Sequence, residues 1–315
     1  MSATSRQSSS AALAHAMRLG ECASGGRNPV AEARERGYGR RVPDAIFAHP
    51  RLAPLYDAFD ADRDDLTAYL GIADELGADR VLDVGCGTGC LAVLLAESGR
   101  IVVGVDPAGA SLEVAKSKDA AARVTWVNGD VTAVPAFGAD LAVMTGNVAQ
   151  VFLTDADWAQ ALQGIRAALR PGGYLVFETR RPERRAWEEW AADPGQVILD
   201  IPGIGSVEQC HEVTDVSLPF VSFRYAYRFL ADGAVVTSNS TLRFRSRDEV
   251  ESSLAALAIE CWMCEKPLIA QVASSCSSPS ARPELQDGSR ALTSQGRASS
   301  RTVALMARRR PQSDA

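Results

Sequence analysis

Apolar and polar positions follow a regular rhythm between residues 80 and 179. Short runs that are apolar on both faces alternate with segments of helical spacing, which is typical of parallel strands covered by helices on both sides. The predicted strands are Arg80–Val84, Ile101–Val105, Val124–Asn128, Leu141–Thr145 and Gly173–Glu178. The predicted helices are Gly89–Ser98, Gly109–Lys118 and Asp155–Leu169, with a single turn at Thr132–Pro135. Helical spacing between 47 and 73 predicts one or two more helices before the first strand.

After the fifth predicted strand, the rhythm changes to strict alternation of apolar and polar side chains, which predicts half-buried strands. Asp232-Gly233 has the chemistry of a tight hairpin turn. The alternating strands are predicted at 207–216, 221–229 and 236–245. They form a small antiparallel insertion, about 196–245, in an α/β fold whose Rossmann-like, mostly parallel sheet has helices on both faces. A helix over Ser246–Leu257 follows, with Ser246 as N-cap and Glu249 completing a capping box.

The two ends of the chain lack the pattern of a packed core. Residues 1–45 are rich in Ser, Ala, Gly and Arg and predict a disordered leader, and the serine-rich segment 265–300 predicts low order. Residues 301–315 recover strand character before a basic tail, so a closing strand is expected there, paired with one at Ile259–Cys264. The alternative is that the C-terminal segment never joins the sheet.

Composition narrows the class of partner. The chain has 315 residues, a net charge of −6 and a pI near 5.3, so it lacks the basic surface that grips nucleic acid. Its apolar runs are too short to cross a membrane, and its N-terminus does not read as a secretory signal. Seven scattered cysteines predict reduced thiols and a cytoplasmic location. Cys261 and Cys264 lack a second pair, so no metal site is expected. Nothing in the sequence indicates an oligomeric state.

The segment Val81–Cys90 carries the strongest candidate chemistry. Gly85, Gly87 and Gly89 follow a predicted strand and open a predicted helix, so they permit a tight turn with positive φ and close approach of a ligand. A dinucleotide fingerprint would need glycine at 90, where this chain has cysteine. Asp83, two residues before the first glycine, would repel a pyrophosphate and attract an ammonium group.

The next two strands end in acidic positions. Asp106 stands 21 residues after Gly85 (106 − 85), where a carboxylate at the end of the second strand accepts ribose hydroxyls. The third strand ends at Asn128-Gly129-Asp130-Val131. Asp130 is placed to accept from an adenine amine, while the Val131 backbone reads the ring edge.

These features, taken together, resemble the class I S-adenosylmethionine-dependent methyltransferases of the small bacterial type. The motifs that carry the resemblance are Val81–Gly89, Asp106, Asn128–Val131 and the turn Pro171-Gly172-Gly173. The resemblance covers about Leu55–Leu257 and implies a methyltransferase domain over 46–264. It implies S-adenosylmethionine as the cofactor and a small molecule as the methyl acceptor, attacked at O, N or C.

The resemblance also implies a set of site residues. The cofactor-binding residues would be Asp83, Gly85, Cys86, Gly87, Gly89, Asp106, Pro107, Asp130, Val131 and Asn147. Tyr56 and Gln150 would line the acceptor site. For Asp130 the alternative is capping of the turn at Thr132, and for Tyr56 it is core packing.

No dedicated catalytic residue is required, because in-line methyl transfer needs mainly alignment. His211 is the one weak candidate for a base, and a surface position on a strand is its alternative. Arg180 and Arg181 are predicted to belong to a solvated helix start, and the alternative is that they attract an acidic substrate. Two other functions stay open: a nicotinamide-dependent oxidoreductase, and a non-catalytic protein of the same fold. About forty residues separate the last two predicted strands, which departs from the family pattern.

Overall fold

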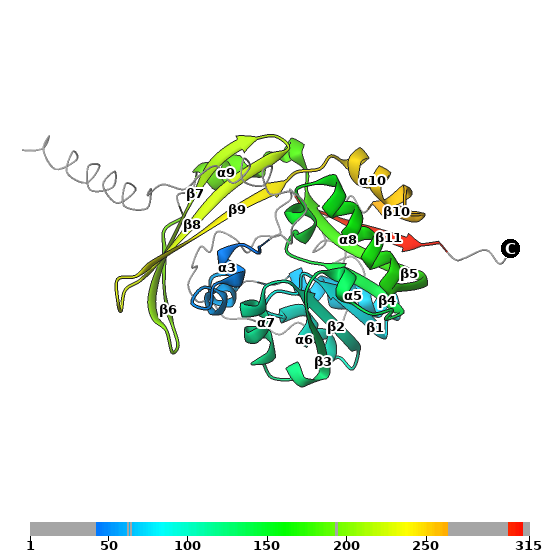
Figure 1. Ribbon diagram of the computed structural model, residues 1–315, viewed down its shortest axis with the longest axis horizontal. Coiled ribbons are helices and arrows are strands. Elements are labelled where there is room, and N and C mark those ends of the chain that lie inside the picture. Colours follow the sequence, from blue (N-terminus) through cyan, green and yellow to red (C-terminus); the bar gives the residue numbers. More distant parts are fainter. Residues whose placement is uncertain (1–41, 62, 64, 193–194, 264–301, 311–315) are drawn as a thin grey trace, which may run out of the picture. The chain divides into compact units, whose positions relative to one another are not determined.

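The parallel sheet predicted from the apolar runs forms the centre of the computed structural model, which describes residues 42–61, 63, 65–192, 195–263 and 302–310. The sheet has seven strands in the order β10-β11-β5-β4-β1-β2-β3 (Figure 1). Their bounds are β1 Arg80–Val84, β2 Ile101–Asp106, β3 Val124–Asn128, β4 Ala139–Met144, β5 Leu169–Arg180, β10 Ile259–Met263 and β11 Thr302–Arg309. Strands β1 to β5 are parallel, and β11 runs antiparallel to β5 and to β10. The predicted fold class is confirmed.

Helices cover both faces of this sheet. The longer ones are α5 Asp65–Glu75, α6 Cys90–Glu97, α7 Gly109–Lys116, α8 Asp155–Ala168 and α10 Arg247–Ala255. Strand β5 shows the two layers, because Phe177 packs in the core with α8 and α10 while Val176 packs in the core with α5 and α6. Apolar side chains on both faces of a strand are what a doubly covered parallel sheet requires.

Short elements complete the described chain. They are the helices α3 Ala45–Ala48, α4 Tyr56–Phe59 and α9 Ala186–Ala192, and the 3₁₀ turns η1 Ala53–Leu55, η2 Ala121–Arg123, η3 Val131–Ala133, η4 Val148–Val151 and η5 Pro182–Arg184. The predicted capping box at Ser246 and Glu249 is present at the start of α10. Within the described residues, no helix is long and apolar enough to cross a membrane.

The predicted antiparallel insertion is a second sheet of four strands. It runs in the order β6-β7-β8-β9, with bounds β6 Val197–Ile201, β7 Gly205–Ser217, β8 Phe220–Phe229 and β9 Val235–Arg243. One face packs on the N-terminal helices: the Phe59 ring lies 5.7 Å from that of Tyr227, and the Ile46 N–H donates to Ser238 Oγ at 2.9 Å. The sheet is therefore held against the segment that precedes β1.

Two predictions about the sheet need correction or completion. The turn expected at Pro171-Gly172-Gly173 lies inside β5, which begins at Leu169. It interrupts the pairing with β4, which passes from Leu169 to Tyr174, and Gly172 has φ of +78°. The C-terminal strands do join the sheet: Leu305 of β11 pairs with Phe177 of β5, and Ile259 of β10 pairs with Arg309. The predicted leader, apart from residues 42–45, and the serine-rich segment 265–300 lie outside the described residues.

Candidate functional site

The glycine loop follows β1 and turns sharply into α6. The N–H groups of Gly85 and Cys86 both donate to Val105 O, at 2.8 and 3.2 Å, and the Gly89 N–H donates to Cys86 O at 2.8 Å. Gly85, Gly87 and Gly89 have φ of +72°, +54° and +77°. Residues with a β-carbon are strained in this region, so the backbone itself requires the three glycines.

The three glycines differ in what surrounds them. A β-carbon on Gly85 would lie 2.7 Å from the Val148 side chain, and one on Gly89 would lie 2.5 Å from the Trp126 ring. A β-carbon on Gly87 would meet nothing within 4 Å. The outer two glycines are therefore explained by close packing, and Gly87 is the one that faces open space.

Asp106, the last residue of β2, points at this loop. Its Oδ2 accepts from the Gly87 N–H at 2.9 Å, and its Oδ1 accepts from the Ala108 N–H at 2.7 Å. Burial raises the pKa of the carboxyl, and these two hydrogen bonds oppose the rise. An ionised carboxylate has about four acceptor positions, so two remain for a ligand.

Asp83 is a more deeply buried carboxyl one strand away, with 1% of its surface exposed. Its Oδ1 has no hydrogen-bond partner in the described structure. Burial, then repulsion from Asp106, raises the pKa of Asp83 to about 7, while Arg63 opposes the rise. Two neighbouring acidic groups with this surplus of negative charge favour a positively charged ligand group.

The end of β4 is held by a carboxylate that the sequence analysis missed. Glu178 of β5 accepts hydrogen bonds from the backbone of Gly146 and Asn147, whose φ values are +63° and +62°. Burial raises the pKa of Glu178, and Arg180 opposes the rise. Its role is to fix the loop that enters η4, since two successive left-handed residues aim their N–H groups at one point.

That loop presents two of the predicted site residues in buried positions. Asn147 is 7% exposed and Gln150 is fully buried. Asn147 Oδ1 and Gln150 Nε2 have no partner in the described structure, whereas Gln150 Oε1 accepts from Arg180 Nη1 at 3.1 Å. Unpaired buried polar atoms are costly unless a ligand or water satisfies them, so this loop favours a polar ligand.

Arg180 corrects the expectation of a solvated helix start. It is the last residue of β5, is largely buried, and places its guanidinium 5.1 Å from the Trp190 ring. Burial lowers its pKa, and the negative charge of Glu178 opposes that change. Period-two alternation along β5, which puts Glu178 and Arg180 on one face, is the signal that would have found this pair.

Tyr56, in α4, belongs to a polar cluster on the N-terminal side. Its hydroxyl is hydrogen-bonded to Asp60, and burial raises its pKa above the usual value. Arg63 lies 3.5 Å from the Asp60 carboxylate and 2.9 Å from that of Asp65. Because the carboxyl of Asp60 also acts on the pKa of Arg180, this cluster lies near the end of β5.

Other predicted residues have local roles. Asp130 Oδ1 accepts from the Thr132 N–H at 2.9 Å and from its hydroxyl, which is the capping alternative, and Val131 is buried beneath it. Pro107 is exposed beside Asp106. His211 Nε2 lies 3.2 Å from Trp190 O, and its ring lies 5.4 Å from that of Tyr225. Its ring nitrogen is thus engaged by the backbone of α9.

Comparison with known proteins finds methyltransferases for part of the chain. Residues 81–173 match the family described as a methyltransferase domain. An uncharacterised methyltransferase of Oceanobacillus iheyensis is 32% identical over 133 residues, which cover 40% of this chain and 62% of that protein. The malonyl-[acyl-carrier protein] O-methyltransferase of Serratia marcescens is also 32% identical over 133 residues, covering 42% and 51%. The chain thus spans between half and two thirds of these two relatives.

A solved structure shows the same fold over a longer stretch. The sugar N-methyltransferase KedS8 of Streptoalloteichus superposes with a TM-score of 0.60 at 18% identity, covering 87% of this chain and 98% of that one. The match at 81–173 contains the glycine loop, Asp106 and η4. It ends before Glu178, Arg180 and the antiparallel sheet.

Proposed function

We propose that this chain transfers the methyl group of S-adenosylmethionine to a small-molecule acceptor by in-line displacement. The observation that carries the proposal is the pair of buried carboxyls, Asp83 and Asp106, at the open glycine of the loop after β1. The methyltransferase match over 81–173 supports it.

The residues present fit the cofactor. The free Oδ1 of Asp83 suits the ammonium group of the amino-acid end, and the surplus negative charge also suits a sulfonium. Asp106 keeps acceptor positions for the ribose hydroxyls, and the open side of Gly87 gives a ligand access to the backbone. Asp130 and Val131 remain the proposed adenine contacts. When bound, the cofactor supplies a positively charged sulfonium with an electrophilic methyl group.

The acceptor would be aligned by residues from three elements. Gln150 of η4 offers its free amide, Arg180 ends β5, and Tyr56 with Asp60 lies in and after α4. The Tyr225 ring of the antiparallel sheet lies close to this wall, because it is 5.4 Å from the ring of His211, whose Nε2 contacts the Trp190 carbonyl oxygen. Holding two reactants in line contributes roughly 7–11 kcal/mol in favourable cases, so alignment and exclusion of water suffice without a dedicated base. The cytoplasmic location stays a prediction from the sequence.

Replacing Asp106 tests the cofactor assignment. Asp106→Asn removes the charge but preserves the shape of the side chain. A charge-assisted hydrogen bond contributes roughly 1.5–3 kcal/mol, so we expect S-adenosylhomocysteine to bind at least about tenfold more weakly in calorimetry. Glu97→Gln, at the exposed end of α6, is the matched control and should bind like the wild type. Equal affinity in the wild type and Asp106→Asn would contradict the assignment.

A further inference from the structure

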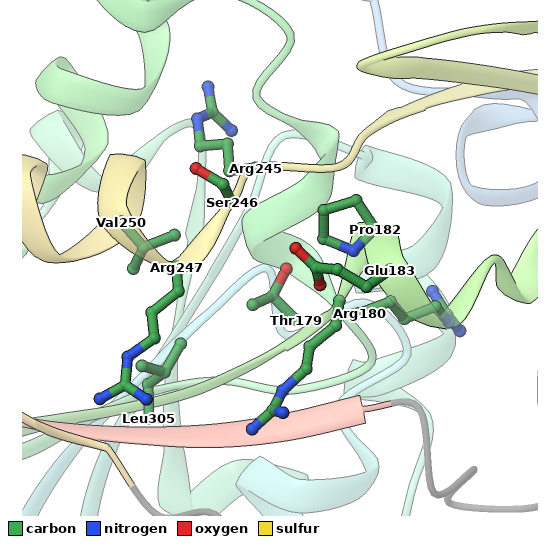
Figure 2. Close-up of a pocket in the computed structure, with 10 residues that line it drawn as sticks. Thr179, Arg180, Pro182, Glu183, Arg245, Ser246, Arg247, Val250 and Leu305 are labelled. Atoms are coloured by element: carbon green, nitrogen blue, oxygen red, sulfur yellow. The ribbon is translucent and has the colours of Figure 1, made fainter.

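A cationic pocket lies beyond the end of β5, between the η5 turn and the start of α10 (Figure 2). Its volume is about 190 Å³. The lining residues are Thr179, Arg180, Arg181, Pro182, Glu183, Arg245, Ser246, Arg247, Val250 and Leu305. Since a single water needs roughly 10–15 Å³ by this measure, the pocket has room for a phosphate or carboxylate group with part of its carrier.

The charge of the lining is strongly positive. Four arginines meet one carboxylate, that of Glu183. Arg247 is offset by Glu251 at 2.8 Å, but among the described residues neither Arg180 nor Arg181 forms an ion pair within 4.0 Å. Arg180 donates to the neutral amide of Gln150, and the nearby carboxylate of Glu178 partly offsets its charge. Arg181 is half-buried. A half-buried cation without a carboxylate is costly, and an anionic ligand would remove that cost.

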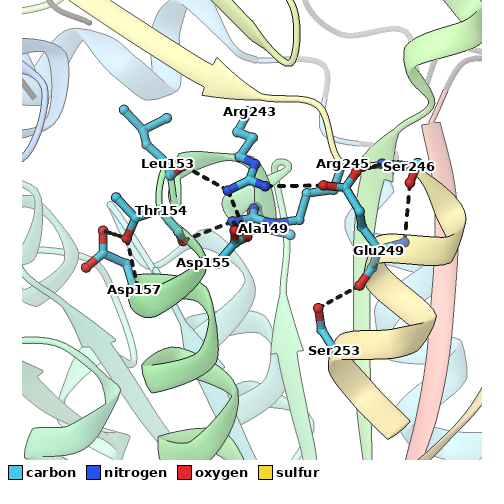
Figure 3. A network of polar contacts seen from close by, with 10 residues as sticks. All are labelled: Ala149, Leu153, Thr154, Asp155, Asp157, Arg243, Arg245, Ser246, Glu249 and Ser253. Carbon is cyan, nitrogen blue, oxygen red and sulfur yellow. Dashed lines mark hydrogen bonds and ion pairs between the residues drawn. The ribbon is translucent and has the colours of Figure 1, made fainter. Parts of the chain in front are cut away.

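Arg245 shows the same imbalance in a buried position. It is 4% exposed, and its guanidinium donates to the carbonyl oxygens of Ala149 and Thr154 at 3.4 and 3.1 Å (Figure 3). Its Nε has no partner in the described structure, and the Asp155 carboxylate is 4.0 Å away. Burial, then repulsion from Arg243, lowers the pKa of Arg245 to about 10. The positive charge of Arg245 is therefore only partly balanced, by a carboxylate at the limit of ion-pair distance.

Two of these arginines also contact the loop of the candidate methyl-transfer site. Arg180 donates to Gln150 in η4, and Arg245 donates to the carbonyl oxygen of Ala149 in the same turn. The pocket and the loop that carries the unpaired Asn147 and Gln150 amides are thus joined by direct hydrogen bonds.

We propose that this pocket binds an oxyanion, the phosphate or carboxylate group of a small molecule. The guanidinium group of Arg181 recognises it in the positive field of Arg180, Arg245 and Arg247, and Glu183 at the rim weakens binding by repulsion. The site does not depend on methyl transfer, because the positive charge of its lining arginines is independent of the cofactor. The small molecule that carries this phosphate or carboxylate group is either the methyl acceptor, which would extend past Gln150, or a separate effector.

The test is calorimetric titration of the full chain at constant ionic strength with pyrophosphate, inorganic phosphate and succinate. Arg181→Gln should weaken the tightest-binding anion by about fivefold or more, because it removes a charge-assisted hydrogen bond. Glu183→Gln should strengthen binding by about twofold to fivefold, the range expected for a rim charge. The matched control is Arg185→Gln, outside the pocket lining, whose side chain is 63% exposed and paired with Glu188. It should leave the affinity unchanged.

Arg181→Gln and Glu183→Gln together keep the test decisive. Absence of saturable binding by all three anions would overturn the proposal, as would equal affinities in Arg181→Gln and Arg185→Gln. If Arg181→Gln fails to fold, unchanged binding in Glu183→Gln contradicts the site. S-adenosylhomocysteine binding, measured separately on the same proteins, reports on the methyltransferase assignment, so either proposal can fail alone. An effect of bound S-adenosylhomocysteine on anion affinity would indicate that the carrier is the acceptor.

Discussion

Asp83→Asn is expected to stabilise the ligand-free protein at pH 8 and to leave it almost unchanged at pH 4. The folded protein raises the pKa of this carboxyl from 3.8 to about 7, so it holds the proton more tightly than the unfolded chain. Stability is therefore lost as the pH rises from about 4 to about 7, by at most roughly 4 kcal/mol. Urea unfolding of both proteins across this range measures the effect.

The same substitution should weaken the ligand. At pH 8 we expect at least about a tenfold loss of S-adenosylhomocysteine affinity, because an ammonium group loses its charged partner. In the wild type, affinity should fall as the pH drops below about 7 and Asp83 takes up a proton. Loss of stability in Asp83→Asn at pH 8, or unchanged affinity, would show that the free Oδ1 has another purpose.

Gly89→Ala is expected to destabilise the protein more than Gly87→Ala. Both residues have positive φ, which costs about 1–2 kcal/mol for alanine. At 89 the new β-carbon also meets Trp126 at 2.5 Å and Ala115 at 2.9 Å, and overpacking adds about 1–3 kcal/mol. Denaturant unfolding should thus give a loss of about 2–5 kcal/mol for Gly89→Ala.

Gly87→Ala is the matched control, and it is expected to change ligand affinity more than stability. Its β-carbon would enter open space, so it should impair S-adenosylhomocysteine binding more than its modest effect on stability suggests. If both variants lose the same stability and neither changes affinity, the loop does not divide into packed and ligand-facing glycines as described.

The sequence was informative where local patterns decide structure. Strands β1 and β3 have the predicted bounds, because buried apolar runs between turn residues specify them locally. Strand β6, Val-Ile-Leu-Asp-Ile, was missed because its sequence lacks the alternation of apolar and polar residues by which the other strands of this sheet were found. The pairing of β11 with β5 joins residues more than 120 positions apart, and only tertiary contact decides such a pairing.

The candidate site likewise contains residues that the sequence revealed and residues that it did not. Asp83, Asp106 and the glycines were found because motif spacing places them at strand ends. Glu178 and Arg180 were missed because their burial comes from distant segments: the loop after β4, the N-terminal helices and the antiparallel sheet. A sequence window around β5 shows charged residues and cannot show what covers them.

A crystal structure of the chain with S-adenosylhomocysteine would show where the ligand binds. We expect its amino group against Asp83, its backbone contacts at Gly87, and its ribose hydroxyls on Asp106. A ligand bound away from this edge of the sheet, or an Asp106 side chain turned away from the ligand, would disprove the proposed cofactor site.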